Sequence, residues 1–372
     1  MKKIALVLLC SFALSGYAQE NVKHFIFTSD VHFGLVKEQF RGQKNVSAAV
    51  VNESMAKAMN GLPQLALPGD SLVAAGETIK YIEAVIITGD LANRQEEGIQ
   101  SAATSWQQFS EVYFKQLHLQ KNNGQPSSLY LTAGNHDVSN AIGYHKKMLP
   151  TTDATAYIGI YNSMMHPSMP KTVNTFDYSV DKVHYSKDIN GIHFQFINLW
   201  PDSAERVWME KDLEKIPAKT PVLIFAHSIP DVEARFFKNP NGNHSINAAD
   251  RFENLMEEVF KDGMLVNDAA VIEQKAWADF LRKHQNIKAY FHGHNNHTEY
   301  YTWSGPEHNV ALNCIRVDSP MKGKLSAKNE SQLSFELISI DSNKKILTVR
   351  ECLWNNNGDG SVKWGASTHI TL

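Results

Sequence analysis

Five short apolar runs lie along the chain, and each ends in a polar cluster. They are rich in β-branched and aromatic residues and are stopped by glycine or polar side chains, a pattern that predicts buried strands. The runs cover residues 24–28, 84–88, 129–132, 221–225 and 287–291.

Apolar positions at helical spacing fill the stretches between these runs. Strands that alternate with helices indicate a layered α/β fold. The predicted helices cover residues 48–59, 101–117, 203–215, 247–260 and 269–283.

The pattern changes after His294, where residues 310–317, 333–340 and 345–352 look like consecutive strands. Their partial alternation is typical of an antiparallel sheet. No linker interrupts residues 22–353, so we predict one domain of two packed sheets with helices outside. Residues 354–372 are then expected to be a C-terminal extension.

The N-terminus differs from the rest of the chain. Two lysines precede an apolar run over residues 4–14, and small residues follow at positions 15–18. This order predicts a secretory signal peptide over residues 1–18 and therefore a periplasmic or secreted protein. Leu9 stands before Cys10 where a lipoprotein signal has a small residue, so no lipid anchor is expected.

Composition and charge narrow the function classes. The chain has 372 residues, 43% of them apolar, which suffices for a sizeable core. Loss of Lys2 and Lys3 with the signal would change the formal net charge from −3 to −5. Without a basic block, no nucleic-acid partner is expected. The mature region also has no apolar run long enough for a membrane span. Cys314 and Cys352 could pair or stay as buried thiols.

The polar clusters after the five runs carry Asp, Asn and His. In open α/β sheets, residues at the carboxyl ends of strands gather at one edge, where ligands bind. Carboxylate, carboxamide and imidazole are ligands for divalent ions. Two such ions about 4 Å apart can clamp a phosphate and lower the pKa of a water between them.

Taken in order, these clusters resemble the motif series of the calcineurin-like metallophosphoesterase family, over about residues 22–353. That series is Asp-x-His, Gly-Asp, Gly-Asn-His followed by Asp or Glu, a lone His and Gly-His-x-His. The resemblance implies a four-layer αββα sandwich of two mixed sheets with helices outside. It also implies hydrolysis of phosphoric ester bonds by a hydroxide that two divalent ions activate.

The resemblance also implies a role for each matching residue. Asp30 and His32 are expected at the first metal and Asp90 between both, while Asn135, His227 and His294 are expected at the second. His136 is expected to protonate the leaving oxygen or to steady the phosphate, with Asp137 orienting its ring.

Asn296 stands where the family has its last histidine. Its carbonyl oxygen could still bind the first ion and would favour Mn²⁺ or Mg²⁺ over Zn²⁺. Mn, Fe, Zn and Mg all stay open as the two ions, and His297 could substitute if the loop shifts.

Three further features bear on the site. Gly69-Asp70 is a second Gly-Asp pair, but no strand precedes it, so we interpret it as a turn. Asn93 and Arg94 are predicted phosphate contacts, and Asn93 replaces the tyrosine ligand of purple acid phosphatases. The loop over residues 239–244 is either a turn or a substrate contact.

The sequence thus predicts an exported phosphoesterase for small phosphorylated substrates, whether monoesters, diesters or pyrophosphates. One alternative is a phosphodiesterase for glycerol or lipid head-group diesters, with an apolar rim near Trp200, Tyr300 or Trp303. Another is a degenerate, non-catalytic metal- or phosphate-binding protein, which Asn296 permits and the retained Asn135, His136 and Asp137 oppose.

Overall fold

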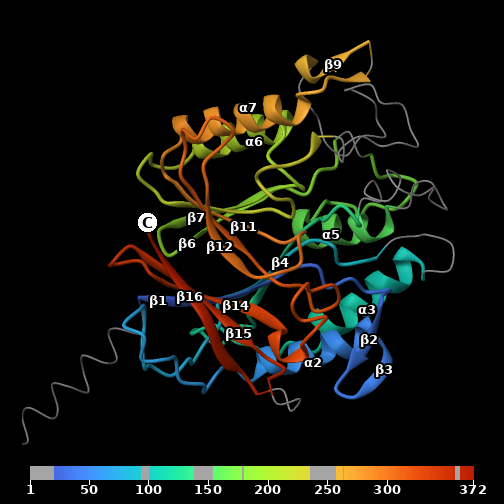
Figure 1. The fold of residues 1–372 in the computed structure, drawn as a ribbon, viewed down its shortest axis with the longest axis vertical. Helices are drawn as coiled ribbons and strands as arrows, with labels where there is room; N and C mark the ends of the chain where they lie inside the picture. Colours follow the sequence, from blue (N-terminus) through green and yellow to red (C-terminus); the bar gives the residue numbers. More distant parts are fainter. Residues whose placement is uncertain are drawn as a thin grey trace, which may run out of the picture.

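The computed structural model describes residues 21–93, 100–137, 154–177, 180–234, 257–262, 264–356 and 361–372. Two six-stranded mixed sheets dominate this part of the chain (Figure 1).

The first sheet has the strand order β16-β15-β14-β1-β4-β5. Its three strands β1, β4 and β5 are parallel, whereas β14, β15 and β16 form an antiparallel meander beside β1. The bounds are β1 Val22–Thr28, β4 Ala84–Thr88, β5 Ser128–Thr132, β14 Ser334–Asp341, β15 Ile346–Leu353 and β16 Lys363–Thr371.

The second sheet has the order β12-β13-β11-β8-β7-β6. The four inner strands are parallel, and β6 and β12 pair antiparallel at the two edges. The bounds are β6 Tyr185–Ile189, β7 Ile192–Phe196, β8 Val222–Phe225, β11 Ile287–His292, β12 Glu299–Trp303 and β13 Leu312–Arg316.

An aromatic core joins the two sheets face to face. The ring of Phe27 in the first sheet lies 5.9 Å from Phe225 and 5.5 Å from Phe291 of the second, measured between centroids. Phe25 likewise contacts Phe194 at 5.1 Å. All five rings are buried in one apolar cluster, which fixes the relative position of the two sheets and thus of their carboxyl edges.

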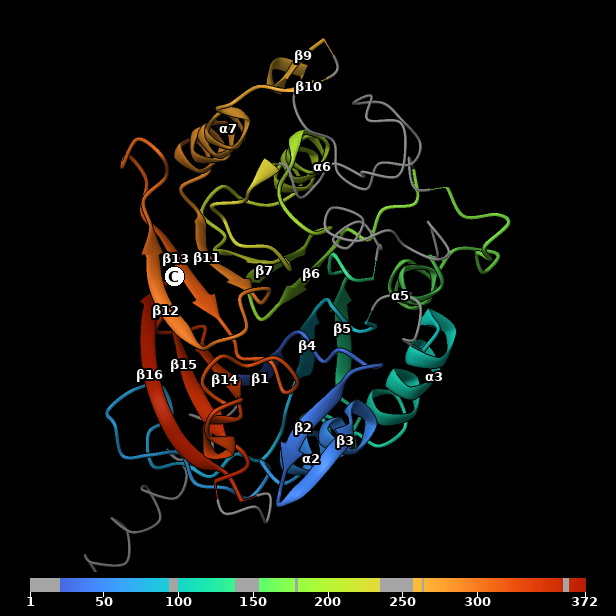
Figure 2. The same ribbon diagram turned by 45° about the vertical axis from the view of Figure 1, so that its right-hand side comes forward.

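Helices cover both outer faces (Figure 2). Helices α2, α3 and α5 lie outside the first sheet, and α6 and α7 lie outside the second, so the predicted four-layer fold with two mixed sheets is confirmed. Their bounds are α2 Ala48–Asn60, α3 Ala102–Tyr113, α5 Thr155–Met165, α6 Ser203–Leu213 and α7 Ala269–Lys283. None of the helices in the described ranges is both long and apolar enough to cross a bilayer.

Two helix starts show how the sequence sets these bounds. Ser101 caps α3 by accepting a hydrogen bond from the backbone N–H of Thr104, and Asp202 caps α6 by accepting one from Glu205. Such caps satisfy amide groups that a helix leaves without partners.

The remaining elements are short. A hairpin of β2 Val36–Phe40 and β3 Gln43–Ser47 precedes α2. Strands β9 Phe260–Lys261 and β10 Met264–Leu265 pair with each other, next to the 3₁₀ turn Glu257–Val259. A second 3₁₀ turn, Glu330–Gln332, precedes β14.

The structure corrects two predictions about these elements and describes only the end of a third. The strand predicted at 310–317 is not part of the antiparallel group, because β13 pairs parallel with β11 in the second sheet. Residues 363–371, predicted to lie in an extension, form the edge strand β16. The helix predicted at 247–260 falls largely outside the described residues, and its end forms a 3₁₀ turn and β9.

The two cysteines are free thiols. Cys314 in β13 and Cys352 in β15 are both buried, and each thiol donates to a carbonyl of its own strand. Of the two states left open by the sequence, the structure has buried thiols.

Candidate metal centre

The loops after β1, β4, β5, β8 and β11 meet at one edge of the sandwich. Backbone hydrogen bonds tie them together: Asp30 N–H donates to Gly89 at 3.0 Å, His32 N–H to Asp90 at 2.9 Å, and Gly293 N–H to His227 at 3.2 Å. The polar clusters that follow separate strands in the sequence therefore form one site, as predicted.

Several residues at this edge adopt left-handed backbone conformations, which cost non-glycine residues roughly 1–3 kcal/mol each. Such strain persists where the surrounding structure enforces it, and it is concentrated at functional sites. The residues are Asp30, His32, Asp90, His294 and Asn296, with φ between 43° and 69°.

Three glycines explain why the motifs need that residue. A Cβ on Gly89, which has φ of +83°, would lie 2.3 Å from the backbone nitrogen of Gly134. A Cβ on Gly134 would lie 2.1 Å from the nitrogen of Asp90, and one on Gly293 would lie 2.1 Å from Asp30 Oδ2. Glycine therefore lets the loops approach closely enough to bring their side chains together.

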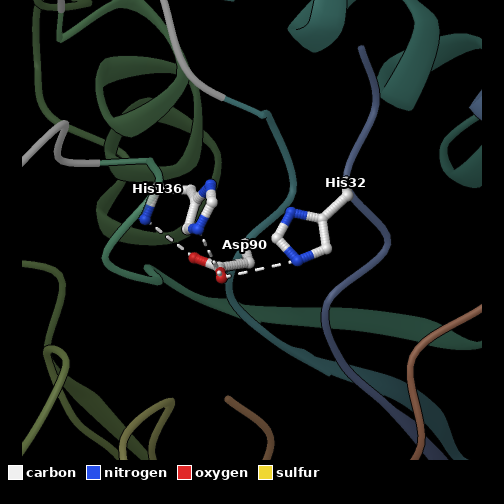
Figure 3. A group of neighbouring side chains, drawn as sticks. All are labelled: His32, Asp90 and His136. Atoms are coloured by element: carbon white, nitrogen blue, oxygen red, sulfur yellow. Dashed lines mark hydrogen bonds and ion pairs between the residues drawn. The ribbon is translucent and has the colours of Figure 1, made fainter. Parts of the chain in front are cut away.

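Asp90 is shared by two groups of possible metal ligands. Ligand atoms of Asp90, His32 and His136 form one group, and those of Asp90, Asp30 and His227 form the other, each with all atoms within 4.8 Å of one another. Figure 3 shows the first, where Asp90 Oδ2 lies 3.7 Å from His32 Nε2 and 3.8 Å from His136 Nε2. Asp90 therefore lies within ligand range of both groups, and the first group includes His136, which the resemblance did not place at a metal.

The residues expected at the second metal also converge. Asn135 Oδ1 lies 2.8 Å from His227 Nε2 and 3.0 Å from His294 Nδ1. His227 donates from Nδ1 to the carbonyl of Thr88 at 2.8 Å, which leaves its Nε2 facing Asp90 Oδ2 at 3.4 Å. Lone pairs that face one another repel, so this position requires a cation, either a proton or a metal ion.

The pKa of His227 also indicates that this position favours a positive charge. Burial disfavours the charged imidazole, yet the carboxylates of Asp90 and Asp30 raise its pKa to about 9. Burial and the charge of His227 lower the pKa of the neighbouring His294 to about 4. The pair therefore holds one positive charge in the absence of metal, and a divalent ion could replace it.

Buried polar atoms without hydrogen-bond partners mark the first metal position. Within the described ranges, these include Asp30 Oδ1, both ring nitrogens of His32, and Asn296 Oδ1. Leaving such an atom without a partner costs about 1–3 kcal/mol, and a cation beside Asp30 Oδ1 and His32 Nε2, which lie 3.7 Å apart, would satisfy those two atoms. The donor atoms therefore fit a divalent-metal centre, with Asp90 common to both groups of possible ligands.

The position of His297 favours Asn296 as the ligand at the end of this motif. His297 Nδ1 faces the carbonyl of Asn295 at 2.9 Å, and its Nε2 contacts the guanidinium of Arg316. Asn296 donates from its amide nitrogen to the His294 carbonyl at 3.0 Å, which orients its own carbonyl oxygen away from that contact.

Asp137 does not have the position that the resemblance implied. Its carboxylate accepts backbone N–H groups of Gly134 at 2.8 Å, Ala92 at 2.9 Å and Leu91 at 3.3 Å. It therefore holds the loops after β4 and β5 together. The ring of His136 is oriented by another residue.

That residue is Asn93, whose Oδ1 lies 3.0 Å from His136 Nδ1. The backbone of His136 in turn donates to Asp90 Oδ1 at 2.8 Å. Asn93 is thus buried at the site as a partner of the imidazole, whereas Arg94 lies outside the described residues. The loop at 239–244 also lies outside them.

Lys322 is a site residue that the motifs did not indicate. It follows β13, and its Nζ lies 3.4 Å from His136 Nε2. No spacing in the sequence connects it with the motif residues, so only the fold could reveal it.

The proposed apolar rim is not supported. Trp200 and Trp303 are buried, and the hydroxyl of Tyr300 donates to Glu336 at 2.7 Å. The two tryptophans therefore offer no exposed surface to a lipid, and Tyr300 is half-buried.

The fold and the donor set define an α/β sandwich protein with a candidate divalent-metal centre. The family model of calcineurin-like phosphoesterases matches residues 23–312, and the chain belongs to this family.

Similar solved structures include Vps29 from Chaetomium thermophilum, at 9% identity and a TM-score of 0.33, covering 94% of this chain and 95% of that one. A single mutant of Vps29 from Entamoeba histolytica matches at 9% identity and a TM-score of 0.33, covering 93% of this chain and 98% of that one. The calcineurin-like phosphoesterase YfkN from Bacillus subtilis matches at 14% identity and a TM-score of 0.30, covering 94% of this chain and 90% of that one. The search of curated proteins gave no match. The family assignment rests on the family model.

Proposed function

We propose that this protein is a metal-dependent phosphoesterase that hydrolyses small phosphate esters or pyrophosphates at two divalent ions. The observation that carries the proposal is the shared position of Asp90, whose carboxylate belongs to both groups of possible ligands. A carboxylate between two ions is the arrangement that a two-metal hydrolase needs.

In the order of the family motifs, Asp30, His32, Asp90 and Asn296 would hold the first ion, and Asp90, Asn135, His227 and His294 would hold the second. In the structure, ligand atoms of Asp30 also lie within 4.8 Å of His227, and those of His136 within 4.8 Å of His32. When bound, such ions supply a nucleophilic water at neutral pH and stabilise charge on the phosphate. The carboxamide oxygen of Asn296 favours Mn²⁺ or Mg²⁺ at the first position.

His136 is the proposed proton donor to the leaving oxygen. Its ring stands beside Asp90, and Asn93 fixes it through Nδ1, so Nε2 is directed to the metal edge. A positioned imidazole that transfers a proton contributes about 10²–10⁴-fold to such reactions.

Export is a separate part of the proposal. The basic, apolar and small residues of positions 1–18 support it, and these positions lie outside the described residues. Mass spectrometry of the natively expressed protein should find an N-terminus near Gln19, and an intact Met1 in the cytoplasm would contradict export.

Metal analysis combined with a substrate panel tests the enzymatic proposal. The purified protein should bind close to two equivalents of Mn²⁺ and hydrolyse a phosphate monoester, a diester or a pyrophosphate. Bound metal without turnover of any ester would instead indicate the non-catalytic metal-binding alternative. Absence of metal binding would refute both.

A further inference from the structure

The connection between β13 and β14 lies against the candidate metal centre. Ser319 donates from its hydroxyl to the carbonyl of Asp30 at 2.7 Å, and Lys324 N–H donates to the carbonyl of Asn296 at 2.7 Å. These two bonds attach the segment to two of the proposed first-metal residues. Lys322 lies between them.

The conformation of this segment is tightly fixed. The hydroxyl of Ser319 also accepts the backbone N–H of Lys322 at 2.9 Å. A Cβ on Gly323 would lie 1.9 Å from Ser326 Oγ and 2.3 Å from Asp318 Oδ1, so a larger residue there would displace these two side chains. The backbone of Lys322 is therefore held in place before any ligand arrives.

The side chain of Lys322 extends into the site and is half-buried. Its Nζ lies 3.4 Å from His136 Nε2. This distance places the ammonium beside the ring that the proposed function makes the proton donor.

Two further cations lie near this segment. Arg316 forms an ion pair with Glu299. Lys37 is buried and donates to the carbonyl of Pro320 at 2.9 Å, which supports the segment from behind. Lys322 is the cation that the segment directs at the proposed proton donor.

We propose that Lys322 binds a terminal phosphate oxygen of the substrate and makes the site select phosphate monoesters over diesters. A monoester carries a second negative charge near neutral pH, because the second pKa of a phosphate is about 6. A diester carries one charge. Since the attraction to a fixed ammonium scales with the charge of the partner, Lys322 stabilises the dianion more. This proposal rests on the proposed phosphoesterase function.

Exchange of Lys322 for methionine tests the proposal, and Lys324→Met is the matched control. Lys324 belongs to the same segment but is exposed, so its ammonium is in solvent. With Mn²⁺ bound, kcat and KM are measured for p-nitrophenyl phosphate and for bis(p-nitrophenyl) phosphate. Manganese content and calorimetric binding of inorganic phosphate are measured on the same samples.

Lys322→Met should lower kcat/KM for the monoester about 10- to 100-fold, the range of a lost charged hydrogen bond. The fold-loss in kcat/KM for the diester should be smaller than that for the monoester by a factor of at least about three, because the diester carries less charge. Phosphate binding should weaken while manganese content stays unchanged. Lys322→Arg should recover part of the selectivity, and Lys324→Met should match the wild type in all four measurements.

Equal losses for both esters, or loss of manganese in both Lys322 variants, would overturn the proposal in favour of a structural role. Unchanged monoester kinetics would overturn it as well. If the manganese-loaded wild type hydrolyses neither these esters nor pyrophosphate, the phosphoesterase function fails, and phosphate binding still decides the role of Lys322. Weaker phosphate binding by Lys322→Met would then support it, and equal binding or none would refute it.

Discussion

The dipeptide Gly-Asp occurs twice in the N-terminal half of the chain, as Gly69-Asp70 and Gly89-Asp90, and the two aspartates contact different side chains. Asp90 follows β4, is 2% exposed, and faces the rings of His32, His136 and His227. Asp70 lies in a turn, and both of its oxygens accept hydrogen bonds from Arg350.

The difference lies in where each carboxylate finds its counter-charge. Arg350 in β15 is 1% exposed and supplies a permanent cation to Asp70 at 2.7 and 2.8 Å. Asp90 faces imidazoles instead, and these supply no permanent charge. A buried carboxylate without a fixed cation is a place where a metal ion can bind, so the partner side chains, and not the dipeptide, determine the role.

The largest expected effect separates the two aspartates by activity. Asp90→Asn removes the negative charge that both proposed ions share, so turnover should be abolished and metal content should fall. Asp70→Asn should leave kcat within a few-fold of the wild type and metal content unchanged. Metal analysis and steady-state kinetics on both variants measure this. Equal losses from the two changes would mean that Asp90 is not the bridge.

The second effect concerns the imidazole beside Asp90. His136→Ala should retain its metal and lose about 10²–10⁴-fold in rate with a poor leaving group. The loss should be smaller with nitrophenol, which leaves as an anion and needs no proton. A loss that is independent of the leaving group would assign His136 to phosphate binding instead of proton transfer.

The sequence predicted the metal edge better than the surroundings of His136. Strand ends carry local signals, because an apolar run that stops at Gly and Asp indicates both the strand and its edge. The partner of the His136 ring depends on tertiary contacts instead. Asp137 is adjacent to His136 in sequence, yet it accepts backbone N–H groups such as that of Ala92, 45 positions away. Asn93 is the residue whose side chain contacts the His136 ring.

The sheet of β13, the strand β16 and the position of Lys322 were not predicted for the same reason, because each depends on tertiary contacts. β13 is apolar enough for either sheet, and only packing against β11 decides its partner. β16 alternates weakly because it is an edge strand with one largely exposed face. Lys322 lies in a connecting segment whose sequence has no motif, so its position depends on the folding of Ser319 and Gly323 around it.

The third prediction compares the stability effects of replacing Gly89 and Gly69, the glycines of the two Gly-Asp pairs. A Cβ on Gly89 would lie 2.3 Å from backbone, and its φ of +83° disfavours any other residue, whereas a Cβ on Gly69 would have no atom within 4 Å. Gly89→Ala should therefore destabilise the protein by more than about 2 kcal/mol and weaken metal binding, since strain and displaced loops both contribute. Gly69→Ala should leave both unchanged. Thermal denaturation and metal titration test this, and similar melting temperatures would contradict the crowding argument.

The smallest expected effect concerns the stability that Asp70 provides. Asp70→Asn removes the charge opposite Arg350, whose Nη1 already has no hydrogen-bond partner in the described part of the chain. An asparagine oxygen can still accept one of the two bonds. The variant should therefore lose only about 1–2 kcal/mol, the magnitude of a weakened charged hydrogen bond, as measured by denaturant unfolding.

The pH dependence of this loss identifies its cause. Hydrogen bonds from Arg350 hold the pKa of Asp70 below its ordinary value in the folded protein. The ion pair therefore stabilises the fold at pH values above the unfolded pKa of about 3.9 and stops doing so as the pH falls through the lower folded pKa. Wild type and Asp70→Asn should differ at pH 7 and converge once the pH falls below the folded pKa of Asp70. A difference that persists in acid would show that Asp70 acts through packing, and the contrast with Asp90 would no longer be one of counter-charge.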